Sequence, residues 1–331
     1  MGEEWSTWLD AWHEPRSLAV LGLNILVLRG GALGDLVLTL PVLCEIRKSN
    51  PDANVVLLGI FPQARLAMPE FVDRVERLDA PDWIPLFVDG PLPQGVRNRL
   101  DGFDLAVCFL SDPDGVMARN LAVAGVKQVV ASSNRIRSDV HAVYQLAEVL
   151  GQLGLTLQDP VPKLTVRAQF ARSSRLGFHV GSGSPQKNWP IDHWIELTQR
   201  LDGFFGDFLL IGGEADDKVV GEFRARSGLR RLGTILKAGL ADLCEALSGC
   251  AVFVGHDTGV THLAAAVGTP TVALFGPTNP KVWAPLGQHV SVVCSTDGLM
   301  QSIPVAEAAE ETRRRLRGTA CRRAPGSAFT H

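Results

Sequence analysis

Residues 254–278 constrain the fold of this chain more than any other stretch. An apolar run ends there in Asp257, a Thr-Gly step opens a short helix, and a second apolar run follows. This order predicts a strand, a helix and a second strand of an open parallel α/β sheet. Asp257, Thr258 and Gly259 then lie at the carboxyl end of a strand, where such sheets bind their ligands.

The start of that short helix suits an anionic ligand. Its free N–H groups and positive dipole end favour a phosphate or diphosphate beside Thr258 and Gly259. His262 follows about one helical turn later on a similar face, where it either contacts that ligand or packs as a hydrogen-bonded core histidine. The spacing of His256, Asp257 and His262 matches no familiar zinc pattern, so no metal site is expected.

Strands and helices alternate along the rest of the chain, which predicts parallel sheets covered by helices on both faces. Residues 154–174, with two prolines, break the pattern and are the expected linker. We therefore expect a short extension over 1–20 and two Rossmann-like, doubly wound domains that face a central cleft, over 21–160 and 161–331. The final helix could pack back on the first domain. The expected strands are residues 24–29, 54–59, 104–110, 127–131, 176–181, 208–212, 251–255 and 271–275, and the expected helices include 33–48, 140–153, 192–202 and 305–317.

Composition excludes several other classes of protein. A formal net charge of −3 argues against sequence-independent nucleic-acid binding, which needs a strong positive field. The six cysteines form no CxxC pair, so a disulfide framework is not expected. No apolar run reaches the roughly 18 residues of a membrane span, and the acidic start is unlike a signal peptide, so we expect a cytoplasmic protein. The Trp-rich residues 1–20 either pack on the body or touch a membrane surface.

The first glycine loop follows the strand over 24–29. Its glycines allow a sharp turn and close approach to a ligand, but they match the dinucleotide fingerprint only in part. The next strand ends without the acid that would hold an NAD ribose, and no GK[ST] motif is present, so no cofactor is expected. Asp35 lies in the first turn of the following helix. It either complements the helix dipole or removes a proton from an incoming hydroxyl in the cleft.

A second loop, over residues 182–190, joins a strand to a helix. Ser182 and other small residues are followed by Lys187 just before that helix. This order could place an ammonium beside a diphosphate, and a solvated loop lysine is the alternative.

A third strand-to-helix corner contains Gly212 and Gly213, followed by three acids. Glu214, Asp216 or Asp217 could accept hydrogen bonds from ribose hydroxyls. Acids at the start of a helix explain Asp216 and Asp217 equally well.

Three of these motifs together resemble the heptosyltransferase family, glycosyltransferase family 9. Residues 29–41, which include Asp35, are similar to the N-terminal signature of that family. Residues 187–190 resemble its central motif, and residues 257–262 with 275–278 resemble its C-terminal signature. The motifs occur in the family's order and spacing, and the resemblance covers residues 24–317.

The resemblance implies a GT-B fold, with the acceptor mainly in the N-terminal domain and the nucleotide sugar mainly in the C-terminal domain. It implies inverting transfer of a heptose from ADP-L-glycero-D-manno-heptose to the lipopolysaccharide inner core. Lys187 and the helix start would stabilise the leaving diphosphate without a metal ion. By analogy, Asp35 is the general base. The residues expected to bind the donor are Ser182, Lys187, Glu214, Asp257, Thr258, Gly259 and His262.

The acceptor of such an enzyme is an anionic glycolipid. We expect Gly31 and the loop arginines Arg65, Arg119 and Arg135 to bind it, although surface arginines are also commonly only solvated. Peripheral contact with the inner face of the inner membrane would be compatible with this acceptor. The sequence also leaves open another nucleotide sugar, a protein acceptor, or a non-catalytic nucleotide-sugar binding protein in which Asp35 only caps a helix.

Overall fold

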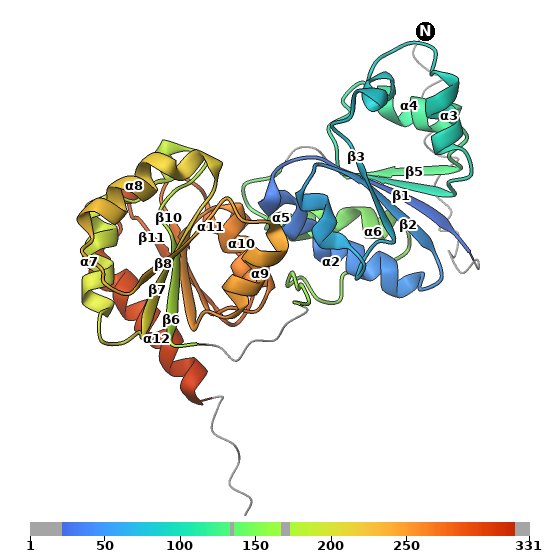
Figure 1. Cartoon of the computed structure of the whole chain (residues 1–331). Helices are drawn as coiled ribbons and strands as arrows, with labels where there is room; N and C mark the ends of the chain where they lie inside the picture. Colours follow the sequence, from blue (N-terminus) through green and yellow to red (C-terminus); the bar gives the residue numbers. More distant parts are fainter. Residues whose placement is uncertain (1–21, 133–135, 167–172, 322–331) are drawn as a thin grey trace, which may run out of the picture. The chain divides into compact units, whose positions relative to one another are not determined.

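The computed structural model describes residues 22–132, 136–166 and 173–321. These residues divide into two compact units, each built on one parallel sheet. Figure 1 shows helices on both faces of the sheets. The first unit consists of the described parts of Met1–Gly30, Thr39–Ile136 and Val143–Pro160, and the second of those of Gly31–Leu38, Arg137–Ala142 and Val161–His331.

The sheet of the first unit has the strand order β3-β2-β1-β4-β5, and all its neighbours pair in parallel. Its central strands are continuous apolar runs because helices cover both of their faces. The strands are β1 (Asn24–Arg29), β2 (Asn54–Gly59), β3 (Arg74–Arg77), β4 (Leu105–Cys108) and β5 (Gln128–Ala131). The helices of this half of the chain are α2 (Leu33–Ser49), α3 (Gln94–Leu100), α4 (Val116–Val123), α5 (Ala142–Leu146) and α6 (Glu148–Gln152), with the 3₁₀ helices η1 (Gln63–Ala67) and η2 (Pro81–Phe87).

The sheet of the second unit has the strand order β11-β10-β9-β6-β7-β8, again with parallel pairing throughout. Its strands are β6 (Arg175–His179), β7 (Asp207–Gly212), β8 (Leu232–Leu236), β9 (Val252–His256), β10 (Thr271–Phe275) and β11 (Val290–Cys294). The helices are α7 (Ile191–Leu201), α8 (Asp217–Arg226), α9 (Leu240–Ser248), α10 (Gly259–Ala266), α11 (Pro280–Trp283) and α12 (Val305–Cys321), with the 3₁₀ helices η3 (Pro185–Lys187), η4 (Glu214–Asp216) and η5 (Met300–Ser302).

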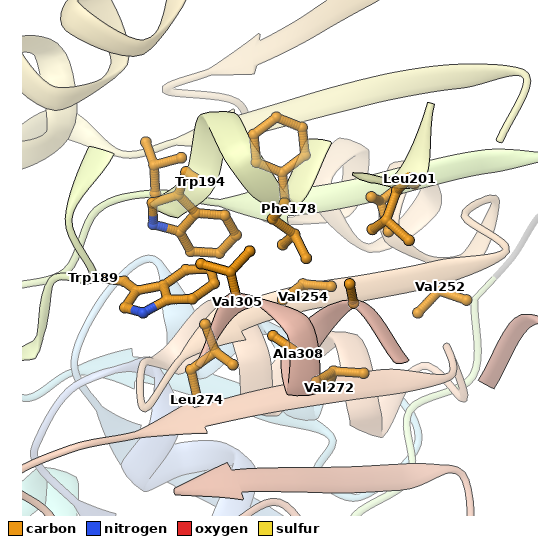
Figure 2. Packing of buried hydrophobic residues seen from close by; sticks show 14 of the residues in the cluster. Phe178, Trp189, Trp194, Leu201, Val252, Val254, Val272, Leu274, Val305 and Ala308 are labelled. Atoms are coloured by element: carbon orange, nitrogen blue, oxygen red, sulfur yellow. The ribbon is translucent and has the colours of Figure 1, made fainter. Parts of the chain in front are cut away.

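The largest buried side chains in the core of the second unit are aromatic. Figure 2 shows Trp189 and Trp194 close to Phe178, with aliphatic side chains of the sheet and of α12 beside them. The rings of Trp189 and Trp194 meet edge to face, with centroids 5.3 Å apart. Helix α12 packs against α7 and against β9, β10 and β11. The segment between β6 and α7 is therefore anchored by Trp189 in the core of this unit.

The fold class is as predicted, an α/β protein with two parallel sheets, and most central elements match the sequence pattern. The sequence pattern did not predict three of the strands, β3, β8 and β11. Each of them lies at the edge of a sheet and is only partly buried, so its sequence shows no continuous apolar run.

The single helix predicted over residues 140–153 is wrong. The chain forms α5 and α6 instead, because the backbone tightens at Ala147, where ψ is −8°. There the amide of Leu150 donates to the carbonyl of Ala147, as in a 3₁₀ turn. In the described residues, no helix combines the length and the apolar character that crossing a membrane would require.

Candidate functional site

The order of strands in the second sheet reverses between β6 and β9. The chain runs from β6 to β7 and β8 on one side, then returns to add β9, β10 and β11 on the other. Strands β6 and β9 pair in parallel, so both end at the same edge of the sheet. The loops that follow them leave in opposite directions, and a ligand can bind at such a switch point. These two loops contain Lys187 and Asp257.

Lys187 and Asp257 form an ion pair at this edge. The Lys187 Nζ lies 2.8 Å from Asp257 Oδ2, and the two side chains are 30% and 10% exposed. On the other side, His262 Nε2 lies 3.7 Å from Asp257 Oδ1. Burial by itself would raise the pKa of Asp257, but His262 and Lys187, helped by Thr278, outweigh it and lower the pKa to about 2. Asp257 is therefore a carboxylate that holds the ammonium of Lys187 at the end of the sheet.

Helix α10 begins directly after this carboxylate. Thr258 has extended backbone angles, and its carbonyl accepts hydrogen bonds from the amides of Thr261 and His262. The preceding amides, of Gly259 and Val260, have no carbonyl of their own helix to bond. They form the positive end of the helix, where an anion is stabilised.

Several buried polar atoms near this edge have no hydrogen-bond partner among the described residues. They are Oδ1 of Asn188, next to Lys187, Nδ1 of His262 on α10, and Oγ of Ser295, just after β11. Native proteins pair nearly all their buried polar atoms. A ligand that supplies donors and acceptors would satisfy such atoms.

His256, the last residue of β9, is fully buried and uses both nitrogens of its ring. The amide of Trp189 donates to Nε2 over 2.9 Å, and Nδ1 lies 3.1 Å from the carbonyl of Gly181. Because Nε2 accepts, the ring proton is on Nδ1 and donates to Gly181. Burial is the main reason that the pKa of His256 falls to about 3. The sequence analysis weighed His256 only as a metal ligand and did not predict this role. A histidine within an apolar strand could have indicated a buried hydrogen bond.

Asp216 also has a structural role. His179 Nε2 lies 2.8 Å from its Oδ2, and the amide of Gly213 donates to the same oxygen over 2.6 Å. His179 is the first cause of the lowered pKa of Asp216. The possibility that Asp216 binds a ribose is therefore not favoured, since its carboxylate already has two partners, one of them the buried His179. Glu214 begins η4, directly after Gly213 and the end of β7.

The hydroxyl of Ser182 serves its own loop. It donates to the carbonyl of Ser184 over 2.6 Å and accepts from the amide of Ser184 over 3.2 Å. Donor binding by Ser182 remains a prediction, and its hydroxyl proton is engaged within the turn.

Asp35 lies in the first turn of α2, and its Oδ2 accepts a hydrogen bond from the amide of Ala32 over 2.8 Å. This turn belongs to Gly31–Leu38, which groups with the second unit. Within that unit, a Cβ built on Gly34 would lie 3.4 Å from the His262 ring, and one on Gly259 would lie 2.9 Å from the Gly34 amide nitrogen. Glycines at 34 and 259 thus allow the starts of α2 and α10 to approach closely.

The predicted acceptor residues that the structure describes lie on separate elements of the chain. Gly31 has a φ of +88° and precedes the first turn of α2. Arg65 is exposed on η1, with its guanidinium 5.3 Å from the centre of the Phe61 ring. Arg119 on α4 pairs with Asp89 over 3.1 Å. Arg135 lies outside the described residues.

Residues 112–114 precede α4, and residues 113 and 114 form a turn. Asp112 accepts hydrogen bonds from the amides of Met117 and Ala118 in the first turn of α4. Over the ranges that the structure describes, no group of three or more His, Cys, Asp or Glu side chains is arranged to hold a metal ion.

Known proteins are similar to this chain in both sequence and fold. The family model described as glycosyltransferase family 9 (heptosyltransferase) matches residues 118–310. Lipopolysaccharide heptosyltransferase 1 of Pseudomonas aeruginosa is 34% identical over 142 residues, which are 41% of this chain and 37% of that protein. Lipopolysaccharide heptosyltransferase 1 of Escherichia coli K12 is 30% identical over 305 residues, which are 82% of this chain and 93% of that protein.

Solved structures share the fold of this chain. The E. coli heptosyltransferase WaaC with ADP has a TM-score of 0.72 at 18% identity, over 88% of this chain and 100% of that chain. The same enzyme with ADP-2-deoxy-2-fluoro heptose has a TM-score of 0.70. These likenesses identify the fold as GT-B. Because the family model covers more than half of the chain and the E. coli relative aligns over nearly its whole length, the chain belongs to glycosyltransferase family 9, the heptosyltransferases.

Proposed function

We propose that this protein transfers a heptose from an ADP-heptose donor to an anionic lipopolysaccharide inner-core acceptor, with inversion at the anomeric carbon. The observation that carries the proposal is the pairing of Lys187 with Asp257 beside the start of α10, at the switch point of the second sheet. The names of the relatives support the substrate class, since they are lipopolysaccharide heptosyltransferases, and WaaC was solved with ADP and with an ADP-heptose analogue.

The donor diphosphate is proposed to lie across the start of α10. There the amides of Gly259 and Val260 and the ammonium of Lys187 would surround its oxygens. Lys187 has three N–H donors. Asp257 accepts from the ammonium at Oδ2 over 2.8 Å and at its carbonyl over 3.5 Å, which leaves one N–H for a ligand. His262 and Asn188 would add hydrogen bonds through the buried atoms that lack partners in the described structure.

The transfer would be a single displacement. The carboxylate of Asp35 takes the proton of the acceptor hydroxyl while the hydroxyl oxygen forms a bond to the anomeric carbon. The bond between that carbon and the diphosphate oxygen breaks on the opposite face, and the oxygen keeps the electron pair. One such step inverts the configuration.

Charge develops on the leaving diphosphate during this step. Lys187 and the amides at the start of α10 are fixed before the reaction, so they can stabilise that charge without reorganising. Because these groups belong to the protein, we propose that the transfer proceeds without a divalent cation and expect activity to persist in EDTA.

A thermal-shift panel with ADP-heptose, other ADP-sugars, UDP-sugars and GDP-sugars tests the donor. A ligand that binds only the native state stabilises it by RT ln(1 + [L]/Kd), which is about 2.7 kcal/mol at a hundredfold excess over Kd, and so raises Tm. We expect ADP-heptose to give the largest shift. Preferential stabilisation by a UDP- or GDP-sugar would reject this donor and favour a related transferase.

Turnover is then measured as ADP release with purified inner-core acceptor. Release that requires both donor and acceptor supports the transferase, whereas donor binding without any release would make the chain a nucleotide-sugar binding protein. A protein acceptor would be recognised by sugar incorporation into polypeptide.

A further inference from the structure

The loop over residues 181–189 carries Lys187 from the end of β6 to the start of α7. Several hydrogen bonds stabilise its turns from within: the amide of Lys187 donates to the carbonyl of Ser184 over 2.9 Å, and that of Asn188 donates to Pro185 over 3.1 Å. These bonds join residues of the same loop. They shape the loop, but they do not attach it to the sheet.

His256 attaches this loop to β9 at both ends. Its Nδ1 bonds the carbonyl of Gly181, where the loop begins, and its Nε2 accepts from the amide of Trp189, where the loop ends. The ring is fully buried, so water does not compete for either bond. A neutral imidazole is suited to this place because it offers one donor and one acceptor on opposite sides of a rigid ring.

The next residue along the chain, Asp257, holds the side chain of the same loop. Asp257 Oδ2 lies 2.8 Å from Lys187 Nζ. The end of β9 thus contacts the loop twice in succession: His256 fixes the backbone on both sides of Lys187, and Asp257 fixes the ammonium. A shift of the backbone at 187 would move the ammonium away from the start of α10.

We infer that His256 is a positioning residue that sets the place of the Lys187 ammonium and, through it, the affinity of the protein for a nucleoside diphosphate. This inference rests on the proposed function, because it assigns Lys187 to the diphosphate. Burial is the main cause of the low pKa of His256, which keeps its ring neutral. His256 therefore acts by holding the loop and takes no proton.

Packing alone is the competing explanation for His256. Its ring also lies edge-on to Trp194, with centroids 5.2 Å apart and an interplanar angle of 75°. His256→Phe keeps an aromatic ring of similar size there and removes both hydrogen bonds. His256→Gln restores an acceptor near the Nε2 position, and His256→Asn restores a donor near the Nδ1 position.

The test measures the affinity for ADP by isothermal titration calorimetry, with no acceptor or turnover required. We expect His256→Phe to weaken ADP binding by at least about tenfold, and His256→Gln to recover part of the loss because it can still bond the Trp189 amide. His193→Phe is the matched control. His193 meets the ring of Trp189 at 5.2 Å but contributes no hydrogen bond to the loop ends, so we expect wild-type affinity.

A double-mutant cycle with Lys187→Met separates positioning from general loosening of the fold. If His256 acts through Lys187, His256→Phe should weaken ADP binding much less in the Lys187→Met background than in the wild type. Equal losses in both backgrounds would overturn the inference. If His256→Phe does not fold, as judged by circular dichroism, the same cycle is run with His256→Gln and His256→Asn, whose losses should likewise shrink in that background.

Failure of the inference and failure of the proposed function give different results. A wild-type protein that does not bind ADP contradicts the proposed function itself. A wild-type protein that binds ADP, together with His256 variants that bind it equally well, contradicts only the positioning role.

Discussion

Replacing His256 with glutamine removes an imidazole that the folded protein keeps neutral. The ring is fully buried, its Nε2 accepts a hydrogen bond from the amide of Trp189, and burial is the main cause of a pKa of about 3, below the ordinary value of 6.5. In the unfolded chain the same ring is hydrated and titrates near the ordinary value. The two states therefore bind different numbers of protons in mildly acidic solution.

The sign and size of the effect follow from this difference. Below pH 6.5 the unfolded state binds the additional proton, so the stability that the neutral ring contributes is complete above pH 6.5 and is lost as the pH falls toward 3. Between pH 8 and pH 5 the loss is RT ln(1 + 10^1.5), or about 2 kcal/mol, taken from the pKa values of 6.5 and about 3. The glutamine variant has no such proton and lacks this loss.

The measurement is urea unfolding of both proteins at pH 8 and pH 5, followed by tryptophan fluorescence. The difference in the free energy of unfolding, wild type minus His256→Gln, should fall by about 2 kcal/mol between the two pH values. Taking the difference cancels the titration of every group that does not interact with His256. His256→Asn, which likewise lacks the imidazole, should show the same change with pH as His256→Gln. A difference that is the same at both pH values within about 0.5 kcal/mol would refute the buried neutral ring.

Three further predictions concern other parts of the site. Gly181→Ala should destabilise the protein by about 1–3 kcal/mol in urea unfolding, because the new Cβ would overlap the carboxylate of Asp216. Gly183→Ala is the control: a Cβ there has no described atom within 4 Å, so this substitution should destabilise the protein much less. Equal losses of stability would contradict the packing at Gly181. Asp257→Asn should lower the free energy of unfolding by about 2 kcal/mol at pH 7, since the pKa of the carboxyl is lowered from 3.8 to about 2. Most of this loss should disappear as the pH falls from about 4 to about 2, because the carboxylate is then protonated in both states. A loss of stability unchanged over that range in urea unfolding would refute the ion pair. Asp35→Asn should bind ADP like the wild type yet lose at least about a hundredfold in turnover, and near-normal turnover in an ADP-release assay would exclude Asp35 as the base.

Much of the fold could be predicted because its central strands are buried on both faces. Strands β1, β2 and β10 have the predicted bounds, since an apolar run between polar residues marks a strand that helices cover on two sides. Three of the four edge strands, β3, β8 and β11, could not be found in this way. β3 contains Arg74, Glu76 and Arg77, and half-exposed strands of this kind resemble loops when only apolar runs are counted.

The members of the candidate site could be predicted one by one, but their partners could not. Lys187 was expected beside a diphosphate and Asp257 at a strand end, and nothing local indicated that the two form an ion pair. Asp216 was considered as a ribose ligand because it follows a strand, yet a buried histidine already occupies its carboxylate. A local sequence pattern predicts where a side chain lies along its own strand or helix. It does not predict which other element that side chain faces.

By itself, the sequence determined two parallel α/β sheets and strand ends that carry an acid, a lysine and a helix start. Periodicity and turn residues encode these features locally, within one strand or one turn. Only the tertiary structure decided that β6 lies next to β9. That neighbourhood brings Lys187 to Asp257 across 70 residues of chain, and places His256 between Gly181 and Trp189, 75 and 67 residues away. Strand order and buried hydrogen-bond partners are settled by packing in three dimensions, because every buried polar group must find its partner there.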